Sequence, residues 1–191
     1  QVFTLGYKEA GKNLTTFQQR DFYWLIVNKI QTEPVTAVIE YQETLQVDRE
    51  KWFLVCEQTQ SISINSRIRS NFVRSTHKLL FGNSRKKQMG VIDYENCNFC
   101  NQESQSSDHM LFHCRNVRIF WEQIRLHFIS LFRSSLTAYE AIIGAYDEDY
   151  NLRLQKNIVL LHTRMHIYNA NNKKTQLDLN QLLEEINEHY G

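Results

Sequence analysis

Apolar residues recur every three or four positions through much of the chain, which is the spacing that places them on one face of a helix. We expect each such stripe to pack in a core. The stripes are Tyr23, Ile26, Val27 and Ile30; Ile64, Ile68, Phe72 and Leu79; Val117, Phe120, Trp121, Ile124, Phe128 and Leu131; Leu154, Ile158, Leu161, Met165 and Tyr168; and Leu179, Leu182, Leu183, Ile186 and Tyr190.

Several residues mark the ends of these predicted helices. Thr16 begins a capping-box-like start, Pro34 suits the first turn of a second helix, and Asp178 opens the last one. Gly82 is expected to end a helix over about 64–81. The segment 62–64 alternates like a short strand but is too short to assign.

The composition supports an all-α fold. The chain has 191 residues with one proline and six glycines, and such scarcity of turn residues disfavours many short strands. We expect a helical linker region at 1–60, a basic helix with a small inserted Cys3His zinc-binding motif at 61–133, and a helical tail at 134–191 that packs on the same core.

The ends and the hydropathy suggest a piece of a larger intracellular protein. The chain begins at Gln1 without a methionine, and it lacks a signal peptide and any apolar run of the ~18 residues that a membrane span needs. We therefore expect a fragment of a longer polypeptide with no membrane partner.

Three of the four cysteines lie together with histidines in the pattern C-x2-C-x8-H-x4-C. Tetrahedral structural zinc takes four nitrogen or sulfur ligands, and Cys3His is one of its standard sets. The candidate ligands are Cys97, Cys100, His109 and Cys114. Because protein atoms fill all four positions, we expect one structural Zn²⁺, in a reducing compartment, with no open position for catalysis.

Other interpretations of this cluster stay open. His113 competes with His109 as the imidazole ligand, but neighbours such as His113 and Cys114 point in different directions and chelate one ion poorly. A buried cysteine cluster without metal, or a redox pair of Cys97 and Cys100, would also fit the residues, although no βαβ pattern supports the redox pair.

Positive charge is concentrated in one segment. The formal net charge is +1, but residues 58–92 carry seven basic and no acidic side chains. Arg67, Asn71, Arg74 and Lys78 are spaced along one helical face, and Arg85, Lys86 and Lys87 follow Gly82. This is the pattern expected of phosphate contacts with RNA or DNA, unless acidic residues elsewhere in the fold neutralise the face.

Two weaker nucleic-acid candidates flank the metal ligands. Arg115 and Arg118 start a second basic stripe, which Glu122 interrupts, so that phosphate contact and ordinary surface charge are both possible. Phe99 lies between Cys97 and Cys100, and it either stacks on an unpaired base or forms the small hydrophobic centre of a zinc knuckle.

Residues that resemble catalytic motifs lack the companions such motifs need. Asp147, Glu148 and Asp149 resemble the acidic metal-binding turn of polymerases, but they precede a predicted helix, where carboxylates favour the helix dipole. His162 and His166 are four apart without the glutamate of an HExxH site, so packing or hydrogen bonding is the expected role. We expect a binding module and not an enzyme.

The stretch 72–121 resembles the cysteine–histidine zinc-binding region near the C-terminus of LINE-type (non-LTR) retrotransposon reverse transcriptases. The features that carry the resemblance are a helix before Gly82, a basic run, the segment 90–93 leading into Cys97-x-x-Cys100, then His109-x4-Cys114, and then Phe120-Trp121. Weaker similarities extend outward to 21–25, 51–52, 143–147, 166–170 and 182–186. The eight-residue gap before His109 differs from the four of retroviral nucleocapsid knuckles, so that geometry is not transferred.

The resemblance implies a nucleic-acid-binding region that assists target-primed reverse transcription. Its implied partners are RNA, DNA and the remainder of a reverse transcriptase polypeptide, and its implied locations are a cytoplasmic ribonucleoprotein and the nucleus. Two alternatives stay open: a scaffold whose helices pack on the polymerase body, and a protein–protein adaptor whose basic face meets an acidic partner.

Overall fold

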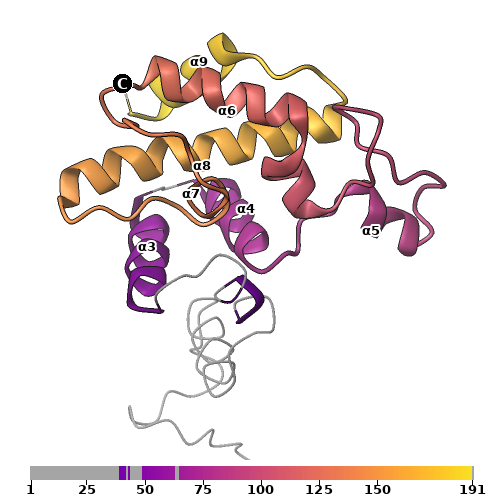
Figure 1. The fold of residues 1–191 in the computed structure, drawn as a ribbon, viewed down its shortest axis with the longest axis horizontal. Helices are drawn as coiled ribbons and strands as arrows, with labels where there is room; N and C mark the ends of the chain where they lie inside the picture. The colour runs from indigo at the N-terminus through magenta and orange to yellow at the C-terminus, as the bar shows by residue number, and fades with distance from the viewer. Residues whose placement is uncertain (1–38, 42, 44–48, 63–64, 191) are drawn as a thin grey trace, which may run out of the picture.

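The computed structural model describes residues 39–41, 43, 49–62 and 65–190, and in this part it consists of helices joined by loops (Figure 1). No strand forms among these residues beyond a single bridge between Asn96 and Ser104, so the expected all-α fold is confirmed. The elements in chain order are α3 (Arg49–Ile62), α4 (Ser66–Thr76), α5 (Asn83–Gln88), the π-helical turn η2 (His109–His113), α6 (Arg115–His127), α7 (Ala138–Ile142), α8 (Tyr150–Lys173) and α9 (Leu179–Tyr190).

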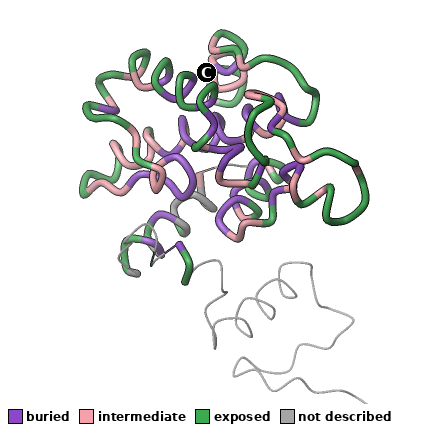
Figure 2. Tube along the Cα trace, turned by 45° about the vertical axis from the view of Figure 1, so that its right-hand side comes forward, coloured by how far each residue is buried: buried purple, intermediate pink, exposed green. Residues whose placement is uncertain are grey.

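Helix α8 runs through the middle of the fold, and α3, α4, α7, α9 and η2 all contact it (Figure 1). Its central turns are buried on most sides, and buried residues gather in the interior of the described part (Figure 2). The predicted stripe therefore described only part of its contacts: Leu161 is buried, Leu154 and Met165 are half-buried, and Val159 and Leu160 are buried as well. A helix packed from several directions has no single apolar face for a periodic pattern to reveal.

The stripes on α6 and α9 follow the predicted faces. Val117, Phe120, Trp121 and Ile124 of α6 are buried, and the Trp121 indole donates a hydrogen bond to the Leu111 carbonyl at 2.8 Å. On α9, Leu182 is fully buried and Leu179, Leu183 and Ile186 are half-buried. The Asp178 carboxylate accepts a hydrogen bond from the Asn180 amide at 2.8 Å, as expected of the residue that opens this helix.

The predicted helix over 64–81 is wrong in its extent. Helix α4 ends at Thr76, and Gly82 is the residue before α5, not the stop of α4. The hydroxyls of Ser75 and Thr76 both bond back to the Phe72 carbonyl, at 2.7 and 3.2 Å. Such side-chain bonds compete with the helix ladder, and the chain then leaves the helix through Lys78, whose φ is +53°.

Three described helices were not predicted. Helix α5 begins directly after Gly82, which was expected only to end a helix. Helix α3 buries Trp52 and Val55, which lie three apart inside a continuous apolar run that hides the spacing. Helix α7 is short, but Thr137 and Glu140 form a complete capping box at its start. That sequence signal, followed by an apolar run, was available and was overlooked.

One hydrophobic core draws residues from all three predicted segments, from Tyr41 and Val55 to Ile124 and Leu182. The helix expected after Thr16 lies outside the described residues, as does most of the one expected after Pro34. Of the helix expected after Pro34, the structure describes residues 39–41 and 43, and among them Tyr41 is buried. Within the described ranges, no helix combines the length and the hydropathy needed to cross a bilayer.

The two histidines of α8 are buried side chains of the fold. His166 stacks on Phe120 at 5.6 Å between ring centres, and its Nδ1 lies 3.3 Å from the Glu185 carboxylate. His162 lies against His189 at 5.1 Å between ring centres. Burial, reinforced by the charge of His189 and opposed by Glu185, lowers the pKa of His162 to about 4.

This shift predicts an acid sensitivity that His162→Gln should reduce. Between pH 4 and the ordinary histidine pKa near 6.5, the unfolded chain binds a proton at His162 that the folded chain does not. Stability therefore falls as pH drops through this window, by up to about 1.4 kcal/mol per pH unit from this group. Urea unfolding of both proteins at several pH values should show a shallower fall in the variant, and equal falls would contradict the assignment.

Candidate metal centre

The structure brings together the side chains of Cys97, Cys100, His109 and Cys114. Their four candidate ligand atoms all lie within 4.8 Å of one another. The Cys97 and Cys114 sulfurs are 3.8 Å apart, and the Cys100 sulfur is 3.6 Å from His109 Nε2. Four inward-facing sulfur and nitrogen atoms at this separation could hold one metal ion.

The first two cysteines come from a tight turn. The Asn101 amide donates to the Cys97 carbonyl at 2.8 Å, and Asn101 closes the turn with a φ of +57°. Asparagine tolerates this left-handed conformation better than most residues. The Phe99 amide donates to the Cys97 sulfur at 3.4 Å, and both thiols reach the same cluster of ligand atoms.

The other two ligands come from η2 and its end. The Cys114 amide donates to the His109 carbonyl at 2.9 Å, an i to i+5 bond of the π type. This winding brings residues five apart to the same side of the turn, which an α-helix would not do. His113, the competing imidazole, is exposed and packs edge-on against Phe112 instead of joining the cluster.

Two residues of the loop between the ligands support the cluster. Glu103 lies 3.5 Å from His109 Nδ1, which leaves Nε2 to face Cys100. The side-chain Nε2 of Gln105 donates a hydrogen bond to the Cys97 sulfur at 3.3 Å. Outer contacts of this kind orient metal ligands. Neither residue was predicted to act in the site, and the signal for both is their position as polar residues in the eight-residue gap between Cys100 and His109.

The cluster favours one thiolate. The hydrogen bond from Cys114 lowers the pKa of the Cys97 thiol, and backbone amides and Gln105 add to this effect against the cost of burial. The same contact and burial raise the pKa of Cys114. A cation bound among the sulfurs would favour deprotonation of all three, because thiolate is the form that ligates metals.

A network of side-chain amides connects residues 97–108, which we call the metal loop, to α5 and to the end of α8. Asn98 Nδ2 donates to the Asn171 carbonyl and side-chain oxygens, at 3.1 and 3.0 Å, and Gln105 Nε2 donates to Asn171 Oδ1 at 2.9 Å. Asn83 Nδ2 donates to Asn98 Oδ1 at 2.9 Å. Asn83, Gln105 and Asn171 are buried, so the metal loop, α5 and α8 are held as one unit.

Only part of the predicted basic face lies exposed on α4. Arg67 and Arg74 are exposed, together with Arg69, but Asn71 is 5% exposed and lies on the packed side. Lys78 lies beyond the end of the helix.

Lys78 is held by carboxylates and a tyrosine ring from other parts of the chain. Its amine lies 2.6 Å from the Glu40 carboxylate, 3.6 Å from Asp108, and 4.5 Å from the centre of the Tyr41 ring. The prediction that it continues a basic helical face was therefore wrong, because the chain leaves the helix before reaching it.

The middle of α5 consists of the predicted basic residues Arg85, Lys86 and Lys87. The first and the last of these are exposed, and Lys86 is half-buried. Lys87 pairs weakly with Glu95, at 3.7 Å. Lys86 reaches the Asn172 side chain at 3.4 Å, which places α5 beside the end of α8.

The flanking candidates take different positions. Phe99 is half-buried and packs against the main core, as expected of the hydrophobic centre of the loop, and its carbonyl accepts a bond from Asn116 at 2.6 Å. Arg115 and Arg118 are exposed on α6. The next arginine, Arg125, is paired with Glu122 at 2.6 Å.

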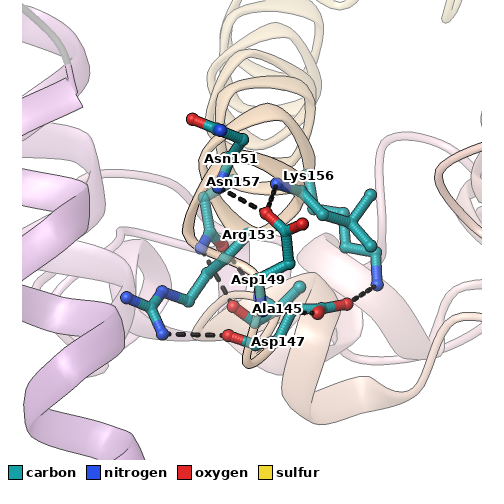
Figure 3. Close-up of polar contacts among 8 residues, drawn as sticks. Ala145, Asp147, Asp149, Asn151, Arg153, Lys156 and Asn157 are labelled. Carbon is teal, nitrogen blue, oxygen red and sulfur yellow. Dashed lines mark hydrogen bonds and ion pairs between the residues drawn. The ribbon is translucent and has the colours of Figure 1, made fainter.

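The acidic residues before α8 hold the start of that helix (Figure 3). The Asp149 carboxylate accepts bonds from the Asn151 and Leu152 amides, at 2.8 and 3.0 Å, and is the cap of α8. Asp147 pairs with Lys156 at 2.8 Å, an interaction that lowers the pKa of this carboxyl. These contacts agree with the interpretation of Asp147 and Asp149 as helix-start residues.

The fold and the cluster define a helical chain with a buried Cys3His group that could bind a metal ion. Comparison of the chain with protein-family models, with curated proteins and with solved structures finds no match.

Proposed function

We propose that this chain is a zinc-stabilised module that binds nucleic acid. The observation that carries the proposal is the set of exposed basic side chains on α4 and α5, and side-chain amides join α5 to the metal loop. The metal has a structural role in this proposal, since protein atoms provide all four ligands and none is left open for water.

The spacing of the ligand atoms supports zinc as the metal. Zinc–sulfur bonds of about 2.3 Å at tetrahedral angles separate two sulfurs by about 3.8 Å, and separate a sulfur from an imidazole nitrogen by about 3.6 Å. The Cys97–Cys114 and Cys100–His109 separations are 3.8 and 3.6 Å. The three thiolate ligands would need a reducing environment to persist.

The free basic charge supports nucleic acid as the ligand. Within the described residues, Arg67, Arg74 and Arg85 have no carboxylate within ion-pair distance, whereas Lys78 does. Unpaired guanidinium and ammonium groups attract phosphates and displace the counterions around them. The resemblance to LINE reverse transcriptases adds RNA or DNA of target-primed reverse transcription as the ligand, and the polymerase body as a partner.

Substitution of single basic residues tests this function. Ala variants of Arg67, Arg74, Arg85, Lys86 or Lys87 should each weaken binding to a similar degree across unrelated sequences. Each should also lower the slope of log affinity against log salt by roughly 0.9 for duplex DNA and roughly 0.7 for single strands. The measurement is fluorescence anisotropy over a salt series, with circular dichroism as the folding control.

Arg133→Ala is the matched control, because Arg133 is exposed on the loop after α6, outside both basic helices. Its salt slope should equal that of the unmodified chain. Slopes that do not change in the folded α4 and α5 variants would contradict the proposed contacts.

A second candidate function is a scaffold that docks on another part of a larger protein. The observation in its favour is the outer side of α6 and the turn after it, where Ile119, Leu126 and Ile129 are 53%, 54% and 57% exposed. A contiguous patch of exposed, large apolar side chains is typical of a surface that contacts another protein. Absence of nucleic-acid binding at low salt by the folded, metal-loaded chain would favour this function.

A further inference from the structure

The end of α8 carries two lysines that lie outside the predicted basic segments. Lys173 is the last residue of α8, Lys174 follows it, and both are exposed. They lie at the same end of the molecule as α5 (Figure 1), and the contact of Lys86 with Asn172 joins the two helices at 3.4 Å. We call Lys86, Lys87, Lys173, Lys174 and the neighbouring Tyr94 the α5–α8 surface.

The amide network makes this surface a fixed arrangement. Asn171, two residues before Lys173, receives bonds from both Asn98 and Gln105 of the metal loop. Asn83 begins α5 and donates to Asn98 and to the Asn96 carbonyl, the latter at 2.7 Å. Lysines that are 86 positions apart in the chain are thereby presented together, which is the preorganisation that favours binding of an extended ligand.

The charge on this surface is only partly neutralised. The Lys87 amine lies 3.7 Å from the Glu95 carboxylate, with which it forms an ion pair. Asp93 is exposed on the same loop. Within the described part of the chain, neither Lys173 nor Lys174 has a carboxylate within ion-pair distance. Positive charge therefore remains at the end of α8, where a phosphate could approach from solvent.

Tyr94 adds an aromatic ring to the same place. The ring is 41% exposed, and the Lys174 amine lies 5.3 Å from its centre. Because the amine lies over the ring, a nucleotide could place its phosphate on the amine and its base on the ring surface that stays exposed. Such stacking needs an unpaired base, because the bases of a duplex are stacked on each other.

We propose that the α5–α8 surface binds single-stranded nucleic acid, with its lysines on phosphates and one base stacked on Tyr94. This rests on the proposed function and adds to it a strand type and three residues: Tyr94, Lys173 and Lys174.

The test uses the full, zinc-loaded chain with labelled oligo-dT, oligo-U and a duplex as probes. Lys173→Gln with Lys174→Asn removes both charges, and asparagine suits the left-handed conformation of Lys174, whose φ is +56°. Each charge removed should lower the single-strand salt slope by roughly 0.7. Tyr94→Leu should weaken single-strand binding roughly 5- to 100-fold, whereas Tyr94→Phe should retain it.

Zinc content and circular dichroism confirm that each variant is intact, and Arg133→Gln is the charge control. An unchanged single-strand slope in the lysine variant overturns this proposal and leaves the proposed function standing. Equal weakening of duplex and single strands by Tyr94→Leu overturns the stacking and the strand type. If the unmodified chain binds no probe at low salt, the proposed function itself fails and this inference with it.

Discussion

Cys114→Ser is expected to remove the metal and to cost the largest part of the chain's stability. Cys114 is fully buried, lies 3.8 Å from the Cys97 sulfur, and immediately precedes α6. Structural zinc contributes its binding free energy to folding, about 10–16 kcal/mol in zinc-finger peptides near neutral pH. We expect metal analysis to fall from one zinc per chain to none, and thermal unfolding to move to a much lower temperature.

The two histidines provide a matched pair for this prediction. His109→Ala should lose the metal as Cys114→Ser does, because its Nε2 faces the Cys100 sulfur at 3.6 Å. His113→Ala should keep the metal and most of the stability, because His113 is exposed and outside the cluster. Retention of zinc in His109→Ala together with its loss in His113→Ala would refute the ligand set.

Gly82→Ala is expected to separate α5 from the metal loop. A Cβ atom at Gly82 would lie 2.2 Å from the Gln105 carbonyl oxygen, which is backbone and cannot rotate away. The Ser84 amide also donates to that carbonyl, at 3.2 Å, and Asn83 bonds to the Gln105 side chain. Overpacking of this kind costs about 1–3 kcal/mol, and here it also displaces a residue that touches Cys97.

Two measurements check this prediction. Urea unfolding should show the loss of stability, and competition with a chelator should show weaker metal retention than in the unmodified chain. Gly90→Ala is the control: its φ of +69° is strained for alanine, but no atom lies within 4 Å of the added Cβ. It should lose about 1–2 kcal/mol of stability and retain its metal normally. Equal metal retention in both glycine variants would argue against the close contact at Gly82.

The metal cluster could be predicted from the sequence because its ligands lie close together in the chain. Cys97 and Cys100 share one turn, and His109 and Cys114 share another, so local spacing carries most of the geometry. The choice of His109 over His113 was possible for the same reason. The buried face of a helix that packs on one side only, such as α6, could likewise be predicted from the spacing of its apolar residues.

Contacts between distant parts of the chain could not be predicted in this way. Lys78 has the spacing of a surface residue, but its partners Glu40 and Asp108 come from other parts of the fold. Asn171 is one polar residue among several near the end of α8, and only its bonds to Asn98 and Gln105 distinguish it. The buried polar side chains of α8 interrupt its apolar stripe, so the hydrophobic pattern does not reveal that this helix lies at the centre of the fold.

The π-helical turn that ends at Cys114 also fixes the rotational phase of α6. Only Cys114, with a ψ of 131°, separates η2 from α6, so the direction in which Val117 and Phe120 face is set by the direction in which the last ligand faces. One residue inserted between Cys114 and Val117 would rotate the rest of α6 by about 100°. The whole buried stripe would then turn away from the core while all four ligands remained. The number of residues on either side of Cys114 is therefore constrained by two requirements at once, the closing of the metal cluster and the register of the helix that follows it.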